Sequence, residues 1–195
     1  WSAAPTASAS REERTFRSGD TDLRGTLYLP QQRGIRGAVV VAHGASSPLR
    51  TSPLYRHLTE MLPSLGMAVF VYDRRGSGAS GGDIGASDYA MLADDALAAV
   101  RMLKADPRLR EARVGIWGLS QGGWLSLLAA SRGKDVDFVV SISAPLVTPD
   151  IQMMFSSANA LAINGYSSAD IDKMRATRQA VDDYMRGIGS REDAQ

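Results

Sequence analysis

The sequence predicts an α/β protein built on a mostly parallel sheet with helices on both faces. Short runs rich in β-branched residues alternate along the chain with longer amphipathic stretches. Several of these runs are almost wholly apolar, as in strands that are buried on both faces. The stretches between them have the length of helices that connect parallel strands.

Six runs are typical of strands. The two earliest are more polar, and the second alternates polar and apolar residues. The stretch "FVVSISA" in the last run looks fully buried on composition and therefore calls for a neighbouring strand. In chain order the six are "RTFRS" (14–18), "LRGTLYLP" (23–30), "RGAVVVAH" (36–43), "MAVFVYD" (67–73), "RVGIWG" (113–118) and "DFVVSISAP" (137–145).

Three helices are expected between these strands. The first spans about residues 54–66, where Pro63 kinks it near its end. The second presents an apolar face over residues 89–103 and is closed by an Asp-Pro pair. The third covers about residues 120–132. The loops that follow the strands then share one edge of the sheet, where ligands bind in such folds.

The last part of the chain has a different pattern. From about residue 150 to 187 two helices follow one another without a strand, and Ser167 with Asp170 resembles a capping box. An apolar stripe is formed by Ile171, Met174, Val181 and Met185. Two interpretations remain open: ordinary core-facing helices, or a cap over a site, since lids are commonly such insertions.

Three segments are therefore expected: a flexible lead-in over residues 1–12, a core over 13–148 and a helical cap over 149–190. The lead-in opens with "WSAAPTASAS", which is small, polar and without periodicity. A removed signal peptide would explain a start at Trp1, and so would the choice of expressed segment. We favour an exported protein over a cytoplasmic one.

Composition excludes several classes of protein. The chain of 195 residues is long enough for one well-buried domain. A net charge of +1 gives no indication of nucleic acid or a membrane surface as partner. No apolar run reaches the roughly 18 residues of a membrane span. Without cysteine there is neither disulfide nor thiolate chemistry, and nothing indicates a metal or organic cofactor.

The stretch "GLSQG" (118–122) carries the predicted chemistry. It has the G-x-S-x-G form between a strand and a helix, where a strained turn lifts the Ser120 hydroxyl above the sheet. Gly118 and Gly122 remove side chains that would collide with the adjoining elements. The N–H of Gln121, at the helix N-terminus, would donate to an oxyanion. We interpret Ser120 as a nucleophile; the alternative is an N-cap serine in a tight turn.

The stretch "HGASS" (43–47), directly after a buried strand, is the second candidate element. Gly44 lets the backbone approach closely, and the N–H of Ala45 is expected to be the second oxyanion donor. His43 precedes the serine and lies on the oxyanion side, so we expect its ring to support the loop. His57 is expected to be a surface histidine.

Three stretches, "VVVAHGASSP", "VFVYDRRGSGAS" and "VGIWGLSQGGW", in this order resemble the α/β-hydrolase superfamily. More narrowly they resemble bacterial serine aminopeptidase-like or acyl-CoA thioesterase-like hydrolases. The likeness runs from about residue 14 to 187. It implies an eight-stranded fold with a Ser–acid–His triad, Ser120 as nucleophile, Ala45 and Gln121 at the oxyanion positions and a helical cap after the sixth strand. A recurring loop with a structural role is matched by Asp73, Arg74 and Arg75.

The rest of the triad has no match. The acid usually follows the seventh strand of this fold and the histidine the eighth, but only strands 1–6 are expected here, strands 7–8 are missing, and no histidine follows Ser120. Asp150 could serve as an acid but has no histidine to orient. Because a sheet that ends at its sixth strand exposes an apolar edge, we expect the N-terminal part of a longer hydrolase. Its C-terminal part would lie in the same or a separate chain.

The expected function is that of a carboxylesterase-like serine hydrolase acting on a small-molecule acyl ester. A peptidase and an acyl-CoA thioesterase are the alternatives on the same fold, because substrate selectivity depends on the pocket and the cap. The alternative from another class is a binding or scaffold protein with an inert Ser120. A dehalogenase-like site would need a carboxylate in the strand-to-helix turn, and Ser120 at that position argues against it.

Overall fold

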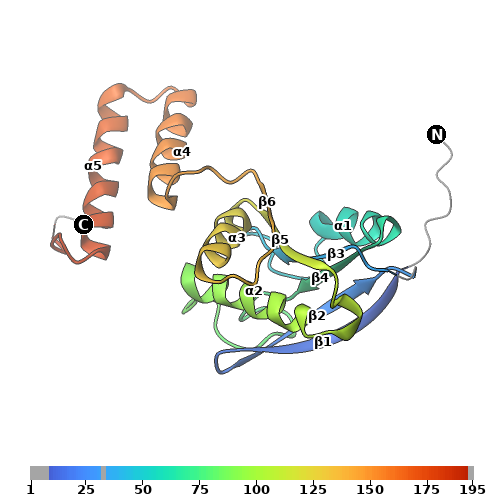
Figure 1. Ribbon diagram of the computed structural model, residues 1–195. Helices are drawn as coiled ribbons and strands as arrows, with labels where there is room; N and C mark the ends of the chain where they lie inside the picture. The colour runs from blue at the N-terminus through green and yellow to red at the C-terminus, as the bar shows by residue number, and fades with distance from the viewer. Residues whose placement is uncertain (1–8, 32–33, 193–195) are drawn as a thin grey trace, which may run out of the picture. The chain divides into compact units, whose positions relative to one another are not determined.

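The computed structural model describes residues 9–31 and 34–192 (Figure 1). The chain divides into two compact units, Trp1–Ala144 and Pro145–Gln195. The division falls a few residues before the boundary expected at residue 148. The first strand begins at Ser10, inside the segment expected as a lead-in, whose residues 1–8 lie outside the described ones.

The first unit contains one sheet of six strands in the order β1-β2-β4-β3-β5-β6. The strands are β1 (Ser10–Ser18), β2 (Thr21–Leu29), β3 (Gly37–Ala42), β4 (Met67–Tyr72), β5 (Arg113–Leu119) and β6 (Val139–Ile142). β1 and β2 join the sheet as antiparallel strands, whereas β3, β4, β5 and β6 run parallel to their neighbours in that set. The predicted α/β class with a mostly parallel sheet is confirmed.

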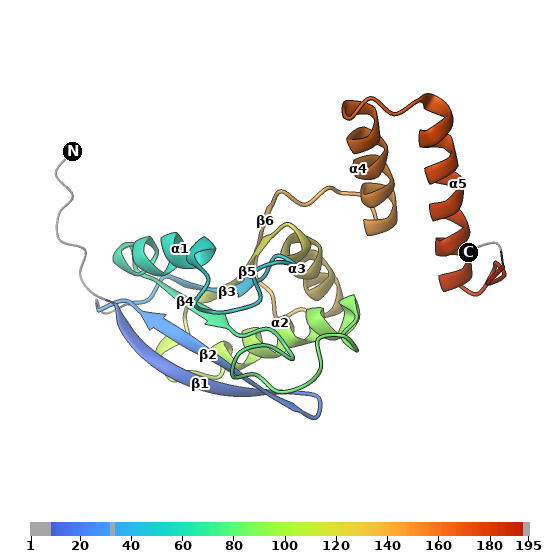
Figure 2. The same ribbon diagram turned by 180° about the vertical axis from the view of Figure 1, so that it is seen from behind.

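Helices cover both faces of this sheet (Figures 1 and 2). The helix α1 (Arg56–Met61) lies on one face, and α2 (Tyr89–Lys104) and α3 (Gln121–Arg132) lie together on the other. The helix expected over residues 54–66 is broken up: α1 is followed by a 3₁₀ turn, Pro63–Leu65, and Gly66 at φ 81° ends it. Proline and a left-handed glycine account for the break.

The two faces of β3 explain its continuous apolar run. Val40 and Ala42 pack into the core under α2 and α3, while Val39 and Val41 pack under α1. Successive side chains of a strand point to opposite faces, so a strand covered on both sides needs apolar residues at every position. The next strand, β4, lies in the centre of the sheet and is apolar at successive positions for the same reason.

The expectation that the sixth strand is fully buried is wrong. β6 covers only Val139–Ile142, and within the described chain its strand partner is β5. Val140 and Ile142 are 37% and 39% exposed. The reason is its place in the sheet: β6 is an edge strand, so one of its sides has no neighbouring strand among the described residues.

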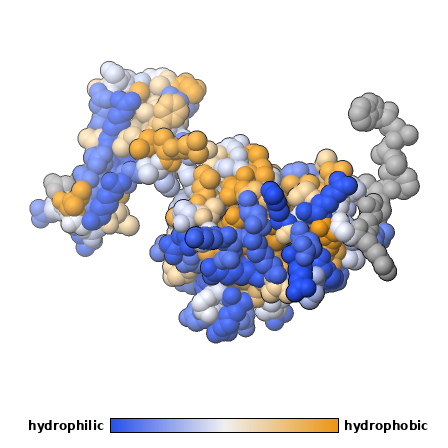
Figure 3. Space-filling view, in the orientation of Figure 1, coloured by the Kyte–Doolittle hydropathy of each residue, from blue (hydrophilic) through white to orange (hydrophobic). Residues whose placement is uncertain are grey.

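The second unit is a helical hairpin of α4 (Pro149–Ile163) and α5 (Ser168–Met185), which lie side by side (Figure 1). The Ser167 hydroxyl accepts a hydrogen bond from the Asp170 N–H, and the Asp170 carboxylate accepts one from the Ser167 N–H. This is the capping box that the sequence predicts. The hairpin buries little: Phe155 is 65% and Met185 76% exposed, and apolar side chains reach its surface (Figure 3).

Candidate active site

Ser120 lies in the turn between β5 and α3 and is exposed. Its backbone has φ 53° and ψ −116°, outside the conformations that non-glycine residues ordinarily adopt. Two backbone hydrogen bonds hold this conformation. The Ser120 N–H donates to the Ile142 carbonyl at 2.8 Å, and the Gly123 N–H donates to the Ser120 carbonyl at 2.8 Å. The turn therefore depends on β6 as well as on its own strand and helix.

The elbow, which is the strand-to-helix turn of residues 118–123, requires glycines because it is closely packed. A Cβ atom on Gly118 would lie 2.1 Å from the Gly122 carbonyl oxygen, and one on Gly122 would lie 2.0 Å from the Ala42 carbonyl oxygen. Gly123, which the sequence analysis missed, has the same property, since its Cβ would lie 2.4 Å from the Ala144 Cβ. The second glycine of "QGG" is the signal that could have identified it.

The loop after β3 lies next to Ser120. A Cβ on Gly44 would lie 4.0 Å from the Ser120 Cβ. The Gly44 N–H donates to the Tyr55 hydroxyl at 3.1 Å, and that hydroxyl donates to the Ser47 carbonyl at 3.0 Å. The exposed Ala45 lies between these two anchored residues. Tyr55 is a further supporting residue that no sequence motif indicated.

The two histidines have contrasting surroundings. His43 is 2% exposed, and its ring meets those of Tyr55 and Tyr72 edge-on at 5.1 Å each. Burial, reinforced by the positive charge of Arg74, lowers the pKa of His43 to about 3, so the ring is neutral at neutral pH. His57 is exposed, and its ring centroid lies 5.8 Å from the ring centroid of Trp117.

The loop after β4 is held by buried charged groups. Oδ1 of Asp73 accepts from the Arg50 N–H and Oδ2 from the Ala79 N–H, each at 2.9 Å. The Arg75 guanidinium forms a bidentate ion pair with Asp95 on α2, at 3.0 and 2.5 Å. These contacts tie the end of β4 to the glycine-containing turn of residues 76–82 and to α2.

Arg74, between these two residues, reaches the elbow itself. Its Nη1 donates to Oε1 of Gln121 at 2.7 Å, and its main-chain N–H donates to the Pro48 carbonyl at 2.8 Å. Gln121 is half-buried and begins α3. The elbow and the loop after β3 are thus both hydrogen-bonded to Arg74.

Asp150 belongs to the second unit, in the first turn of α4. A hydrogen bond from the Thr148 side chain, with a smaller effect of Arg186, lowers its pKa. The Arg186 Nη2 donates to Oδ2 of Asp150 at 2.6 Å. The carboxylate is therefore engaged within its own hairpin.

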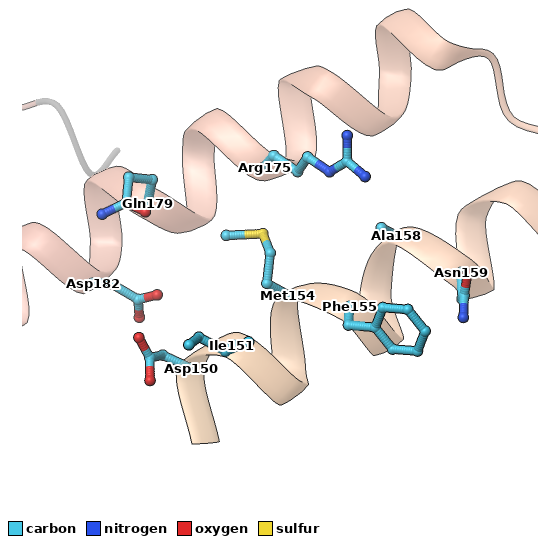
Figure 4. Close-up of a pocket in the computed structure, with 9 residues that line it drawn as sticks. All are labelled: Asp150, Ile151, Met154, Phe155, Ala158, Asn159, Arg175, Gln179 and Asp182. Atoms are coloured by element: carbon cyan, nitrogen blue, oxygen red, sulfur yellow. The ribbon is translucent and has the colours of Figure 1, made fainter. Parts of the chain in front are cut away.

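A cavity of about 410 Å³ lies between α4 and α5 (Figure 4). Met154 points into the space between the helices, and the carboxylates of Asp150 and Asp182 point toward one another. Within residues 9–31 and 34–192, no group of His, Asp and Glu side chains could hold a metal ion. Over the same residues, no helix has the length and apolar character needed to cross a membrane.

Comparison with curated proteins identifies two relatives. A polyketide transferase from Penicillium, grgF, is 33% identical over 129 residues, which are 64% of this chain and 41% of the relative. A thiohydrolase from Aspergillus aculeatus, aneE, is 30% identical over 126 residues, which are 64% of this chain and 38% of the relative. The chain thus spans less than half the length of either protein.

Solved structures share the fold. The crystal structure of the alpha/beta hydrolase GrgF from Penicillium superposes with a TM-score of 0.63 at 25% identity, covering 80% of this chain and 53% of that one. An esterase from Pyrococcus furiosus superposes with a TM-score of 0.64 at 23% identity, covering 79% and 56%. The model of the family described as serine aminopeptidase, S33, matches residues 33–182. This match covers most of the chain, which therefore belongs to the S33 serine aminopeptidase family of α/β hydrolases.

Proposed function

We propose that this chain is the nucleophile-bearing part of a serine hydrolase that cleaves an acyl substrate through Ser120. The observation that carries the proposal is the backbone of Ser120, a non-glycine residue at φ 53° in an exposed strand-to-helix turn. Such strain persists only where the surrounding structure enforces it, and here three close-packed glycines do so. An ordinary N-cap serine needs no such conformation.

The mechanism is acyl transfer to water. The Ser120 Oγ attacks the substrate carbonyl carbon as its proton passes to a histidine from outside this chain, and the carbonyl oxygen becomes an oxyanion. The N–H groups of Ala45 and Gln121 donate to that oxyanion. The leaving group departs with the proton, and water then attacks the acyl-serine and releases the acid. The Gly44 N–H already donates to the Tyr55 hydroxyl, so it is not free to bind the oxyanion. The next N–H along this loop, that of Ala45, is therefore the donor that we propose.

His43 has a supporting role in this proposal. A general base must reach the nucleophile and be protonated readily near the working pH. His43 is enclosed by the rings of Tyr55 and Tyr72, and its low pKa opposes protonation. Its neutral ring fills the space under the loop that carries Ala45.

The apolar edge of β6 supports a triad completed elsewhere. An exposed apolar edge strand is an aggregation hazard that native proteins cover or pair. We propose that further strands pair with β6 and bring the acid and the histidine, in the same or a separate polypeptide. Residues 149–190 would be the cap, because α4 and α5 leave apolar side chains at their surface.

A carboxylic ester is the first substrate class that we propose. A thioester is the second, because one curated relative is named a thiohydrolase and the other a polyketide transferase. The relative rates with p-nitrophenyl butyrate and butyryl-CoA distinguish the two, whereas an aminoacyl anilide tests the peptidase alternative. Turnover of none of the three would favour the binding or scaffold alternative.

The decisive experiment is treatment of the full-length protein with a fluorophosphonate, followed by intact-mass and peptide mass spectrometry. Only an activated serine reacts. We expect one adduct, on Ser120, that is absent in Ser120→Ala. Ser131→Ala, which removes an exposed serine at the far end of α3, is the matched control and should label normally. A folded, unlabelled wild-type protein would refute the nucleophile assignment.

A further inference from the structure

Arg74 contacts both segments that carry the proposed oxyanion donors. Its main-chain N–H donates to the carbonyl of Pro48, in the loop that contains Ala45. Its guanidinium donates to the side chain of Gln121, the residue directly after the nucleophile. The distances are 2.8 and 2.7 Å, so both bonds are close. One residue therefore connects two segments that are distant in sequence.

The charge of Arg74 lacks a counterion of its own. The residue is 8% exposed, yet within the described part of the chain it forms no ion pair, and its Nε has no hydrogen-bond partner. Its neighbours in sequence differ, since Asp73 pairs with Arg50 and Arg75 with Asp95. Burial of an uncompensated guanidinium is unfavourable, and such groups are retained mostly where they serve a site.

We propose that Arg74 is a positioning residue of the oxyanion hole: it fixes the Ala45 loop against the elbow, and its lone positive charge favours the oxyanion. This inference rests on the proposed function of Ser120. The charge has no anionic partner in the resting protein and gains one only when the carbonyl oxygen becomes negative. Its stabilisation is therefore larger in the transition state than with bound substrate, which is the condition for a gain in kcat.

Three variants separate the charge from the hydrogen bond. Arg74→Met removes both and keeps an unbranched stem, and we expect kcat to fall by about 10- to 100-fold with KM within about 2-fold, less than the loss of an oxyanion donor itself. Arg74→Lys keeps the charge and should restore most of kcat. Gln121→Glu keeps the bond and cancels the charge, so kcat should fall while the melting temperature holds. Wild-type kcat in Gln121→Glu would overturn the electrostatic role.

Hydrogen exchange tests the positioning role without catalysis. In the full-length Arg74→Met variant, we expect faster exchange in peptides covering residues 118–123, which lose the side-chain bond to Gln121. Peptides covering residues 43–50, whose bond to the Arg74 main-chain N–H remains, and peptides from α2 should not change. Arg101→Met, which removes an exposed arginine paired with Asp135, is the matched control and should leave both regions unchanged. Unaltered exchange in residues 118–123 of Arg74→Met would overturn the positioning role. A protein whose Ser120 proves inert would refute the proposed function, while the exchange result still decides whether Arg74 holds the two segments.

Discussion

Removal of Asp95 should be one of the most damaging single changes to the stability of this fold. The Asp95 side chain on α2 is 0% exposed and that of Arg75 is 7% exposed. Without the carboxylate, the guanidinium keeps, among the described residues, hydrogen bonds to the Thr21 hydroxyl at 2.6 Å and the Ser18 carbonyl at 3.2 Å. Breaking a buried ion pair from one side costs about 3–5 kcal/mol, because a desolvated charge is left unpaired. We expect Asp95→Ala to lower the free energy of unfolding by that amount.

The neighbouring residue provides a matched control. Asp94 pairs with Arg132 through two bonds of 2.8 Å, but these side chains are 47% and 41% exposed. Solvent screens such a pair, so Asp94→Ala should cost about 0–1 kcal/mol. Both variants replace aspartate by alanine in the interior of the same helix, so the gain in helix propensity is the same and cancels in the comparison.

Urea unfolding followed by circular dichroism measures both free energies. A thermal scan should show Asp95→Ala melting roughly 6–20 °C below wild type, since a chain of this size shifts by about 2–4 °C per kcal/mol. Equal losses for the two variants would refute the reasoning. The double replacement Arg75→Met with Asp95→Leu should recover most of the stability, because it leaves no unpaired charge.

Two other predictions concern the elbow and the buried histidine. Gly122→Ala should lower kcat by about 100-fold and cost about 1–3 kcal/mol, because the new Cβ meets the Ala42 carbonyl oxygen at 2.0 Å. Gly85→Ala, whose Cβ has only an ordinary contact at 3.4 Å, should leave esterase activity and urea stability unchanged, and similar losses in both would contradict this explanation. The pKa of His43 is about 3 in the folded protein against 6.5 for the free side chain, so the unfolded chain binds the extra proton and acid favours unfolding. Its contribution is fully present above pH 6.5 and is lost by about 1.4 kcal/mol per pH unit as the pH falls toward 3. His43→Asn should flatten this part of the curve of unfolding free energy against pH, whereas the exposed His57→Asn should not; equal slopes in all three proteins would argue against a buried neutral ring.

Local patterns in the sequence were sufficient to predict most of the helices and strands of this fold. The apolar runs predicted β3 and β4, because a strand covered on both faces has apolar side chains at every position. Ser167 and Asp170 predicted the start of α5, since a capping box is completed within four residues. The form G-x-S-x-G likewise placed Ser120 between a strand and a helix, because this motif is complete within five residues.

Only the tertiary structure showed which distant residues support the elbow. Tyr55 is bonded to Gly44, 11 positions before it, and Arg74 reaches Gln121 across 47 positions. The exposure of β6 likewise depends on its place at the edge of the sheet, whereas its composition resembles that of a buried strand. The sequence determined most of the helices and strands and the G-x-S-x-G turn, because hydrophobic periodicity, caps and turns act over a few residues. Which side chains surround the motif depended on how strands far apart in the chain align, and that alignment is fixed by packing of the whole sheet.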